Sequence, residues 1–187
     1  MTVTAIAATC IRLIWALFEW LRLLGEPQLG STPYDKHSAR LWDVAIGLEV
    51  IGMLFGLAGV GRIQTSTNLI GYFGLGAMIA GIAIRWAAII TLGRFFTGKV
   101  TIQSDHQLVR GGLYKYVRHP AYSGSLLAHL GLGLSFMNWF SLGFSVIPFA
   151  IAVWYRMRVE DEALRAAFGL AYVDYSKQAK RLIPKLY

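Results

Sequence analysis

Five apolar stretches, separated by polar or glycine-containing breaks, constrain the fold of this sequence more than any other feature. A helix that spans the hydrocarbon core of a membrane needs about 20 mostly apolar residues, so each stretch is a candidate span. The third is long enough to cross with a tilt, whereas the fourth and fifth are short and separated only by the residues MNW. These last two are therefore expected to form a tight helical hairpin. The stretches lie near Ala5–Leu24, Leu41–Val60, Asn68–Leu92, Tyr122–Met137 and Trp139–Tyr155.

Composition supports the same class of fold. Hydrophobic residues make up 56% of the 187 residues and the mean hydropathy is +0.50, which exceeds what a soluble domain hides in its core. The first stretch could be mistaken for a signal peptide, but it lacks a basic start and contains Arg12, Glu19 and Arg22, so we interpret it as a mature helix. The sequence predicts an all-α, multi-pass integral membrane protein with a single membrane domain over residues 1–187.

The formal net charge of +8 comes from basic residues that crowd two segments, the connection after the third stretch and the C-terminal tail. They do not form a soluble face with aromatic partners, so no nucleic-acid partner is expected. With five spans these segments lie on the same side of the membrane, and the positive-inside rule makes that side cytoplasmic, with the N-terminus outside. The basic residues are Arg94, Lys99, Arg110, Lys115 and Arg118, then Arg156, Arg158, Arg165, Lys177, Lys180, Arg181 and Lys185.

Several kinds of site are not expected. The lone Cys10 sits in an apolar stretch, and the four histidines show no ligand spacing such as HExxH, so we predict no metal. The sequence has no Walker loop and no GxGxxG after a strand. A soluble nucleotide-binding domain of the Rossmann type is therefore excluded by pattern and by length.

The connection after the third stretch is polar, and its segment KVTIQ is a candidate extended piece. The pair Gly111-Gly112 permits positive φ or close approach of a ligand, although an ordinary loop also uses glycine, and both interpretations stay open. Pro120 is expected in the first turn of the fourth helix, with His119 near its cap. The amides and dipole of that helix end suit an anionic group beside Arg118 or His119. The alternative is a simple interfacial anchor.

The segment after the fifth stretch carries two charge pairs at helical spacing. Arg156 and Glu160 are four residues apart, as are Arg158 and Glu162, and spacing alone does not choose between the pairs. The hairpin brings both of its open ends to one membrane face, so Arg118 and His119 are expected close to Arg156 and Glu160. Such a pocket fits a small zwitterionic cofactor from the cytoplasm and an apolar acceptor from the bilayer. An amphipathic stripe continues through Leu164, Phe168, Tyr172 and Tyr175.

Two blocks of the sequence resemble the isoprenylcysteine carboxyl methyltransferase family of membrane enzymes, in its short prokaryotic form. The first is HQLVRGGLYKYVRHPAYSG, residues 106–124, which is similar to the family pattern H-x-L-V-x-x-G-x-Y-x-x-x-R-H-P-x-Y-x-G. The second is EDEALRAAFGLAYVDYSKQAKRLIP, residues 160–184, where Asp161 replaces the usual second glutamate. Together the blocks cover roughly the C-terminal half of the chain.

The resemblance implies methyl transfer from S-adenosylmethionine. It assigns the three N-terminal spans to residues 1–92 and the cofactor-binding region, with the hairpin and a cytoplasmic tail helix, to residues 93–187. Arg156 and Glu160 would be the catalytic residues, with Arg156 also binding the acceptor and Glu160 closing the cofactor pocket. Carried over by position, the cofactor contacts would be His106, Gln107, Leu108, Val109, Tyr114, His119, Pro120, Ala121, Tyr122 and Glu160, with Arg118 as a support.

The implied acceptor is lipid-like or prenylated and reaches the site through membrane lipid, and carboxyl O-methylation of an isoprenylcysteine-like substrate is the expected reaction. Two alternatives stay open, the N-methylation of an amine-bearing lipid and a non-catalytic membrane protein that binds S-adenosylmethionine. The resemblance to the short prokaryotic form places the protein in a bacterial or archaeal cytoplasmic membrane, with its cofactor site facing the cytoplasm.

Overall fold

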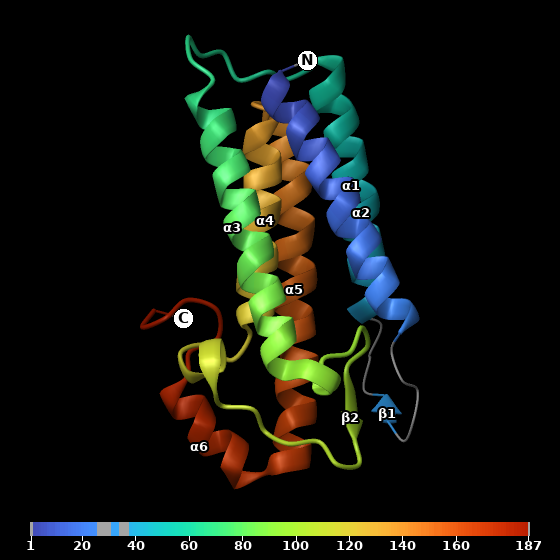
Figure 1. The fold of residues 1–187 in the computed structure, drawn as a ribbon, viewed down its shortest axis with the longest axis vertical. Coiled ribbons are helices and arrows are strands. Elements are labelled where there is room, and N and C mark those ends of the chain that lie inside the picture. The colour runs from blue at the N-terminus through green and yellow to red at the C-terminus, as the bar shows by residue number, and fades with distance from the viewer. Residues whose placement is uncertain (1, 26–30, 34–37, 187) are drawn as a thin grey trace.

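The computed structural model describes residues 2–25, 31–33 and 38–186. Five long helices form a bundle, with the N-terminus at one end and β2, α6 and the C-terminal segment at the other (Figure 1). The long helices are α1 (Val3–Leu24), α2 (Ser38–Ala58), α3 (Leu69–Leu92), α4 (Pro120–Ser135) and α5 (Trp139–Phe168). The shorter elements are β1 (Ser31–Pro33), η1 (Gly93–Phe95), β2 (Thr101–Gln103), η2 (Gly112–Lys115) and α6 (Leu170–Gln178).

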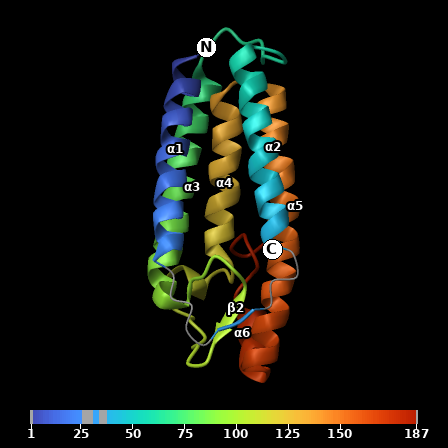
Figure 2. The ribbon, with the colours of Figure 1, turned by 90° about the vertical axis from the view of Figure 1, so that its right-hand side faces the viewer.

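The predicted all-α membrane fold is confirmed. Within the described residues, four helices are long and apolar enough to cross a membrane: α1, α2, α3 with η1, and α5. The fourth predicted span is α4, which has 16 residues and a length of about 24 Å. It lies in the middle of the bundle, in contact with α3 and α5 (Figure 2), and most of its residues are buried. Because α4 is surrounded by other helices, its short length is less of an obstacle to a position inside the membrane than it would be for a helix that faces lipid.

Glycines bring α3 and α4 into backbone contact. A Cβ added at Gly81 would lie 2.4 Å from the backbone nitrogen of Ala128, and one added at Gly124 would lie 2.5 Å from that of Arg85. Side chains at either position would force the helices apart. Small residues at a helix interface allow such close packing in membranes, where apolar side chains alone give little drive for association. The contact fixes α4, and therefore the residues at its N-terminus, against α3.

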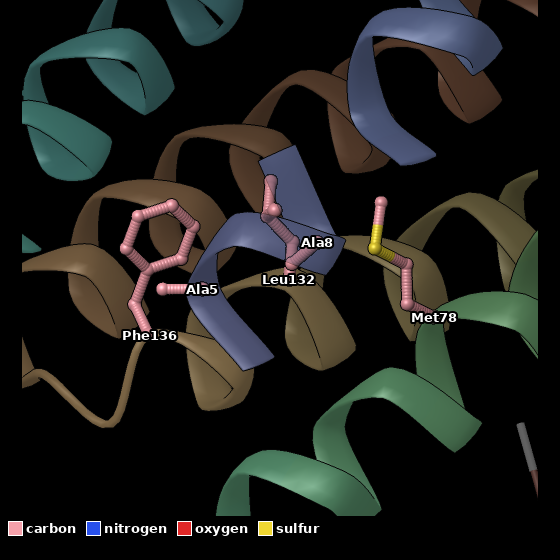
Figure 3. Close-up of a cluster of buried hydrophobic side chains, with 5 residues drawn as sticks. All are labelled: Ala5, Ala8, Met78, Leu132 and Phe136. Atoms are coloured by element: carbon pink, nitrogen blue, oxygen red, sulfur yellow. The ribbon is translucent and has the colours of Figure 1, made fainter. Parts of the chain in front are cut away.

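The first helix packs onto this pair through a small cluster of apolar side chains. Ala5 and Ala8 of α1 lie against Met78 of α3 and against Leu132 and Phe136, at the far end of α4 from Pro120 (Figure 3). Much of the opposite face of α1 is exposed, with large apolar side chains that suit contact with lipid.

The fifth helix is longer than predicted. The predicted apolar stretch ended near Tyr155, but α5 continues to Phe168, so a single helix carries both the span and its charged extension. The predicted amphipathic stripe does not stay on one helix, because Gly169 has a φ of 53° and separates α5 from α6. Glycine tolerates this left-handed conformation without a side-chain clash.

Two local predictions around the polar connection are confirmed. The KVTIQ segment contains β2, which pairs antiparallel with β1, Ser31 opposite Gln103. Pro120 is the first residue of α4 and His119 is its cap. In the glycine pair only Gly112 has positive φ, at 56°, which supports the conformational interpretation of that position.

Candidate active site

The start of α4 and the extension of α5 meet around one buried histidine. The His119 side chain is 3% exposed and lies between two consecutive carboxylates of α5. Its Nδ1 is 3.3 Å from Glu160 Oε2, and its Nε2 is 2.9 Å from Asp161 Oδ1. These residues, far apart in sequence, are adjacent because the turn between α4 and α5 makes the helices antiparallel.

Burial would lower the pKa of His119, but its hydrogen bonds to Asp161 and Glu160 raise that pKa to about 9. The imidazole is therefore protonated at neutral pH and offsets part of the negative charge of the two carboxylates. His106 differs, because its burial lowers its pKa against the opposing effects of Glu160 and Asp105. At neutral pH a neutral His106 and a cationic His119 line the same region.

Asp161 is the centre of the hydrogen-bond network, a role that the sequence analysis did not assign to it. Besides His119, it accepts bonds from Arg118 Nη1 at 3.4 Å, Arg181 Nε at 3.1 Å and the Tyr172 hydroxyl. The side chain is 8% exposed, so these partners replace the water that it gives up on folding. Its place beside Glu160 in the motif was the only available signal, and spacing alone did not connect it to partners in α6 and the tail.

The C-terminal tail completes the backbone of the site. Val117 and Lys180 form a parallel bridge, in which the Arg118 amide donates to the Lys180 carbonyl at 2.7 Å and the Lys180 amide donates to the Tyr116 carbonyl at 3.1 Å. The His119 amide donates to the carbonyl of Arg181 at 3.1 Å. The tail therefore holds the segment before α4 in place, a contact between irregular segments that no sequence periodicity indicates.

A cavity of about 80 Å³ adjoins this network and is lined by the segment before α4, by α5 and by α6. Within it, His106 Nδ1 is buried and has no hydrogen-bond partner among the residues that the structure describes. The His106 ring is stacked on Phe95, with centroids 4.7 Å apart. Of the predicted cofactor residues, those lining the cavity are His106, Gln107, Leu108, Val109, Tyr114, Arg118, His119, Ala121, Tyr122 and Glu160. Pro120 does not line the cavity, although it begins the helix that carries Ala121 and Tyr122.

The N-terminus of α4 offers fewer amide donors than the sequence suggests. The amides of Tyr122 and Ser123 both donate to the carbonyl of His119, at 3.0 and 3.1 Å. Pro120 has no amide hydrogen. An anionic group placed here would therefore depend more on side chains than on the end of the helix.

Arg156 lies at the boundary between this cavity and a second, larger one. Its Nε donates to the Tyr122 hydroxyl at 2.9 Å, and its Nη2 donates to the Gly98 carbonyl. Tyr122 lines both cavities, whereas Arg156 lines only the larger. Arg158, the other candidate, is exposed and stacks on Trp154 with its guanidinium carbon 3.8 Å from the ring centroid. The sequence spacing did not distinguish Arg156 from Arg158, but in the structure only Arg156 is buried at the cavity.

The larger cavity, of about 800 Å³, is lined by residues of all five long helices, and its lining includes the charged residues Arg12, Glu19 and Arg85, which were not expected in a site. Arg85 Nε is 2.6 Å from Glu19 Oε1, and Arg12 Nε is 2.5 Å from Glu49 Oε1. In the sequence, Arg12 and Glu19 were evidence only that the first apolar stretch is a mature helix and not a signal peptide. Charged residues inside predicted spans were the available signal, because such residues are costly in lipid and mark functional positions.

The comparisons with known proteins concern the family to which the chain belongs. The model of the isoprenylcysteine carboxyl methyltransferase family matches residues 74–166. Protein-S-isoprenylcysteine O-methyltransferase B of Arabidopsis thaliana is 37% identical over 162 residues, which cover 83% of this chain and 78% of that protein. The Tribolium castaneum protein-S-isoprenylcysteine O-methyltransferase is 32% identical over 185 residues, 91% of this chain and 63% of that protein.

A solved structure gives the same result in three dimensions. The eukaryotic intramembrane Ras methyltransferase ICMT matches with a TM-score of 0.59 and 26% identity, over 78% of this chain and 51% of that one. The chain therefore spans about half the length of that structure and less than two thirds of several relatives, including protein-S-isoprenylcysteine O-methyltransferase A of Arabidopsis thaliana, at 58%. With the sequence blocks, the fold and these matches in agreement, the chain belongs to the isoprenylcysteine carboxyl methyltransferase family.

Proposed function

We propose that the protein transfers a methyl group from S-adenosylmethionine to the carboxylate of an isoprenylcysteine-like acceptor. The observation that carries this proposal is the arrangement of two adjoining cavities, with Tyr122 lining both and Arg156 beside it in the larger. One cavity is small and has His119 and Glu160 in its wall, and the other is large and is lined by residues of the five long helices. That pairing suits a polar methyl donor and an apolar acceptor that meet at Tyr122.

The smaller cavity has groups that fit the methyl donor. Glu160 would accept hydrogen bonds from the positive amino group of the donor, and the buried His106 Nδ1 would gain the partner that it lacks among the described residues. When bound, S-adenosylmethionine supplies a methyl group on a positively charged sulfur. Glu160 also lies close enough to His119 to be held in one orientation, and fixed groups of this kind contribute much of the acceleration in a displacement reaction.

Arg156 would hold the acceptor. A carboxylate is already ionised at neutral pH, so no general base is needed, and a guanidinium can bind its two oxygens as a planar fork. Tyr122 and the Gly98 carbonyl keep the guanidinium in place from two sides. The apolar part of the acceptor would then lie in the larger cavity.

The membrane and its orientation are part of the proposal. The basic connection and tail favour the cytoplasmic face of the membrane for the cofactor site, with the N-terminus on the other side. The resemblance to the short prokaryotic form of the family favours a bacterial or archaeal membrane. A cysteine placed at Ser104, in sealed vesicles of known orientation, is expected to react only with reagents on the cytoplasmic side. Labelling from the opposite side would contradict this orientation.

The experiment that tests the activity is mass spectrometry of methyl transfer. Purified protein is incubated with methyl-labelled S-adenosylmethionine and either a membrane lipid extract or a panel of prenylated thioether carboxylates. We expect the label in a base-labile methyl ester. Label on a lipid amine would indicate N-methylation instead, and binding of the donor without any transfer would indicate a non-catalytic binding protein.

A further inference from the structure

A short stretch of the connection between α3 and α4 forms most of the wall that the two cavities share. Of the residues that the structure describes, those lining both cavities are Phe96, Thr97, Lys99 and Thr101 of this connection and Tyr122 of α4. Among these residues only Lys99 carries a charge. In the proposed reaction a methyl group passes from one cavity to the other, so both reactants must meet at this wall.

The backbone on both sides of Lys99 is held in place. Before it, the Gly98 carbonyl accepts a hydrogen bond from Arg156 Nη2. The Lys99 carbonyl accepts one from the Thr97 hydroxyl at 2.7 Å. After it, Val100 is 4% exposed and packs against α5. These contacts keep Lys99 at the shared wall, although its side chain is exposed.

Within the described chain, the ammonium group of Lys99 has no carboxylate or other hydrogen-bond partner. Two arginines of the larger cavity differ from it in this respect. Arg12 Nε is 2.5 Å from Glu49 Oε1, and Arg85 Nε is 2.6 Å from Glu19 Oε1. Their charges are balanced by these glutamates, so an anion that enters the cavity is attracted to Lys99 more than to either arginine.

The position of Lys99 next to Gly98 also places it beside Arg156, the residue proposed to hold the acceptor. All three guanidinium nitrogens of Arg156 already donate to protein groups: Nε to the Tyr122 hydroxyl, Nη1 to the Ser38 hydroxyl at 3.4 Å and Nη2 to the Gly98 carbonyl. A carboxylate can accept about four hydrogen bonds on its two oxygens. A second cationic donor beside Arg156 would therefore complete the binding of an acceptor carboxylate.

We propose that Lys99 binds the carboxylate of the acceptor together with Arg156, and that it acts in the capture of the acceptor rather than in the transfer of the methyl group. The inference rests on the proposed function and adds an acceptor-binding residue to the same site. It concerns the carboxylate alone and sets no requirement on the hydrocarbon chain.

The charges in the reaction decide which kinetic constant Lys99 affects. An oxygen of the carboxylate forms a bond to the methyl carbon while the bond from that carbon to sulfur breaks, and the electron pair of the broken bond goes to sulfur. The carboxylate therefore loses negative charge on the way to the transition state, so a cation beside it stabilises the bound acceptor at least as much as the transition state. Arg156 can also orient the two oxygens through its planar group, whereas a lysine is a flexible point charge. Lys99 should thus lower KM for the acceptor without raising kcat.

The test measures methyl transfer to a prenylated thioether carboxylate in a neutral detergent, at saturating S-adenosylmethionine. In Lys99→Gln we expect KM for the acceptor to rise about fivefold at low salt, a change of the size expected for an exposed ion pair, with kcat unchanged. Salt screens exposed charges, so this difference from wild type should shrink as the ionic strength rises.

Two further variants serve as controls. Lys99→Arg keeps the charge, so its KM should stay near that of wild type. Lys115→Gln removes a lysine that is also exposed and also has no side-chain partner within the described residues, but that lines neither cavity. Its KM and kcat should both be unchanged.

A wild-type KM in Lys99→Gln would overturn the inference and leave the methyltransferase proposal intact. A fall in kcat that Lys99→Arg does not restore would overturn it in favour of a structural role, and weaker calorimetric binding of S-adenosylmethionine alone would overturn it in favour of the donor. If no acceptor is methylated, the proposed function fails. Calorimetry with the thioether carboxylate and its methyl ester then decides the inference: Lys99→Gln should lose about fivefold of the wild-type preference for the carboxylate, and an equal preference in both proteins would overturn it.

Discussion

The two cavities differ in how completely their buried charges are paired. At the smaller cavity, Asp161 accepts hydrogen bonds from four side chains that come from the segment before α4, from α6 and from the tail. At the larger cavity, Arg12 makes one hydrogen bond and Arg85 makes two within the described chain. The Asp161 carboxylate is therefore held by many fixed partners before a ligand arrives, whereas each of these arginines of the larger cavity is held by few.

This difference matches the different requirements of the methyl donor and the acceptor in the proposed reaction. The methyl donor in the proposed reaction is always the same molecule, and a pocket that is already ordered loses little conformational freedom when it binds that donor. The acceptor is larger and mostly apolar, so its cavity needs room and a few polar contacts that fix its position.

The largest effect is expected at the densely bonded site. Asp161→Asn removes the charge of a buried carboxylate that His119, Arg118 and Arg181 share, and breaking this buried ionic network should lower the free energy of unfolding by about 3–5 kcal/mol. The measurement is the thermal unfolding midpoint of the protein in detergent. Asp174→Asn is the control, because its exposed pair with Lys177 should leave the midpoint unchanged. Equal midpoints for the two variants would mean that the Asp161 network does not stabilise the fold.

The next effect concerns the residue at the boundary between the cavities. Arg156→Lys keeps the charge but loses the planar fork, so turnover should fall by about 100-fold while the affinity for S-adenosylmethionine stays near that of wild type. Arg158→Lys is the matched control on the exposed face of α5, and its turnover should be nearly unchanged. Similar losses at both positions, or a loss confined to cofactor binding, would exclude an acceptor role for Arg156.

A smaller effect is expected at the wall of the cofactor cavity. Glu160→Gln removes the charge that would face the amino group of S-adenosylmethionine, so binding should weaken by about 1–3 kcal/mol. Isothermal calorimetry in detergent measures this change, and the unfolding midpoint shows whether the variant is folded. An unchanged affinity in a folded variant would remove Glu160 from the cofactor site.

The smallest effect is a dependence of stability on pH. The pKa of His119 is about 9 in the folded protein, above its ordinary value of 6.5, so the stabilisation by its charge is fully present below pH 6.5. It is lost as the pH rises through about 9. The effect is modest because Arg118, Arg181 and Tyr172 still satisfy Asp161 when His119 loses its proton.

The unfolding midpoint should therefore fall between pH 6.5 and 9.5 in wild type and change less over that interval in His119→Gln. The pKa of Tyr175 is raised by burial to about 12, so ionisation of this tyrosine does not contribute in the same interval. A wild-type midpoint that stays constant, or an equal fall in the variant, would show that His119 is not charged in the folded state.

The sequence predicted the parts of this molecule that depend on local pattern. Apolar length located the helices, the proline rule placed Pro120 at the first position of α4, and the hairpin placed His119 next to Glu160. The end of α5 was missed because hydropathy falls after Tyr155 although the helix does not stop there. Polar residues can continue a helix beyond the membrane, so a loss of hydropathy marks the end of a span rather than the end of a helix.

The contacts of the site were less predictable than its members. Arg156 was chosen on the family resemblance, but its bonds to Tyr122 and Gly98 join three segments that no spacing relates. Asp161 was given no role because its partners Tyr172 and Arg181 lie in α6 and the tail. The ionic clusters of the larger cavity were missed for a similar reason, since the pairing of Arg12 with Glu49 depends on how α1 and α2 are rotated in the bundle.

The hydrogen bonds between the tail and the segment before α4 also set an order of assembly. The amides of Arg118 and His119 cannot reach the carbonyls of Lys180 and Arg181 until those later residues have left the ribosome. By then all five long helices have been synthesised and can already be in the membrane. During biogenesis the helical bundle is thus available before the pocket, and a chain that stalls after α5 would be an inserted protein without a formed donor site.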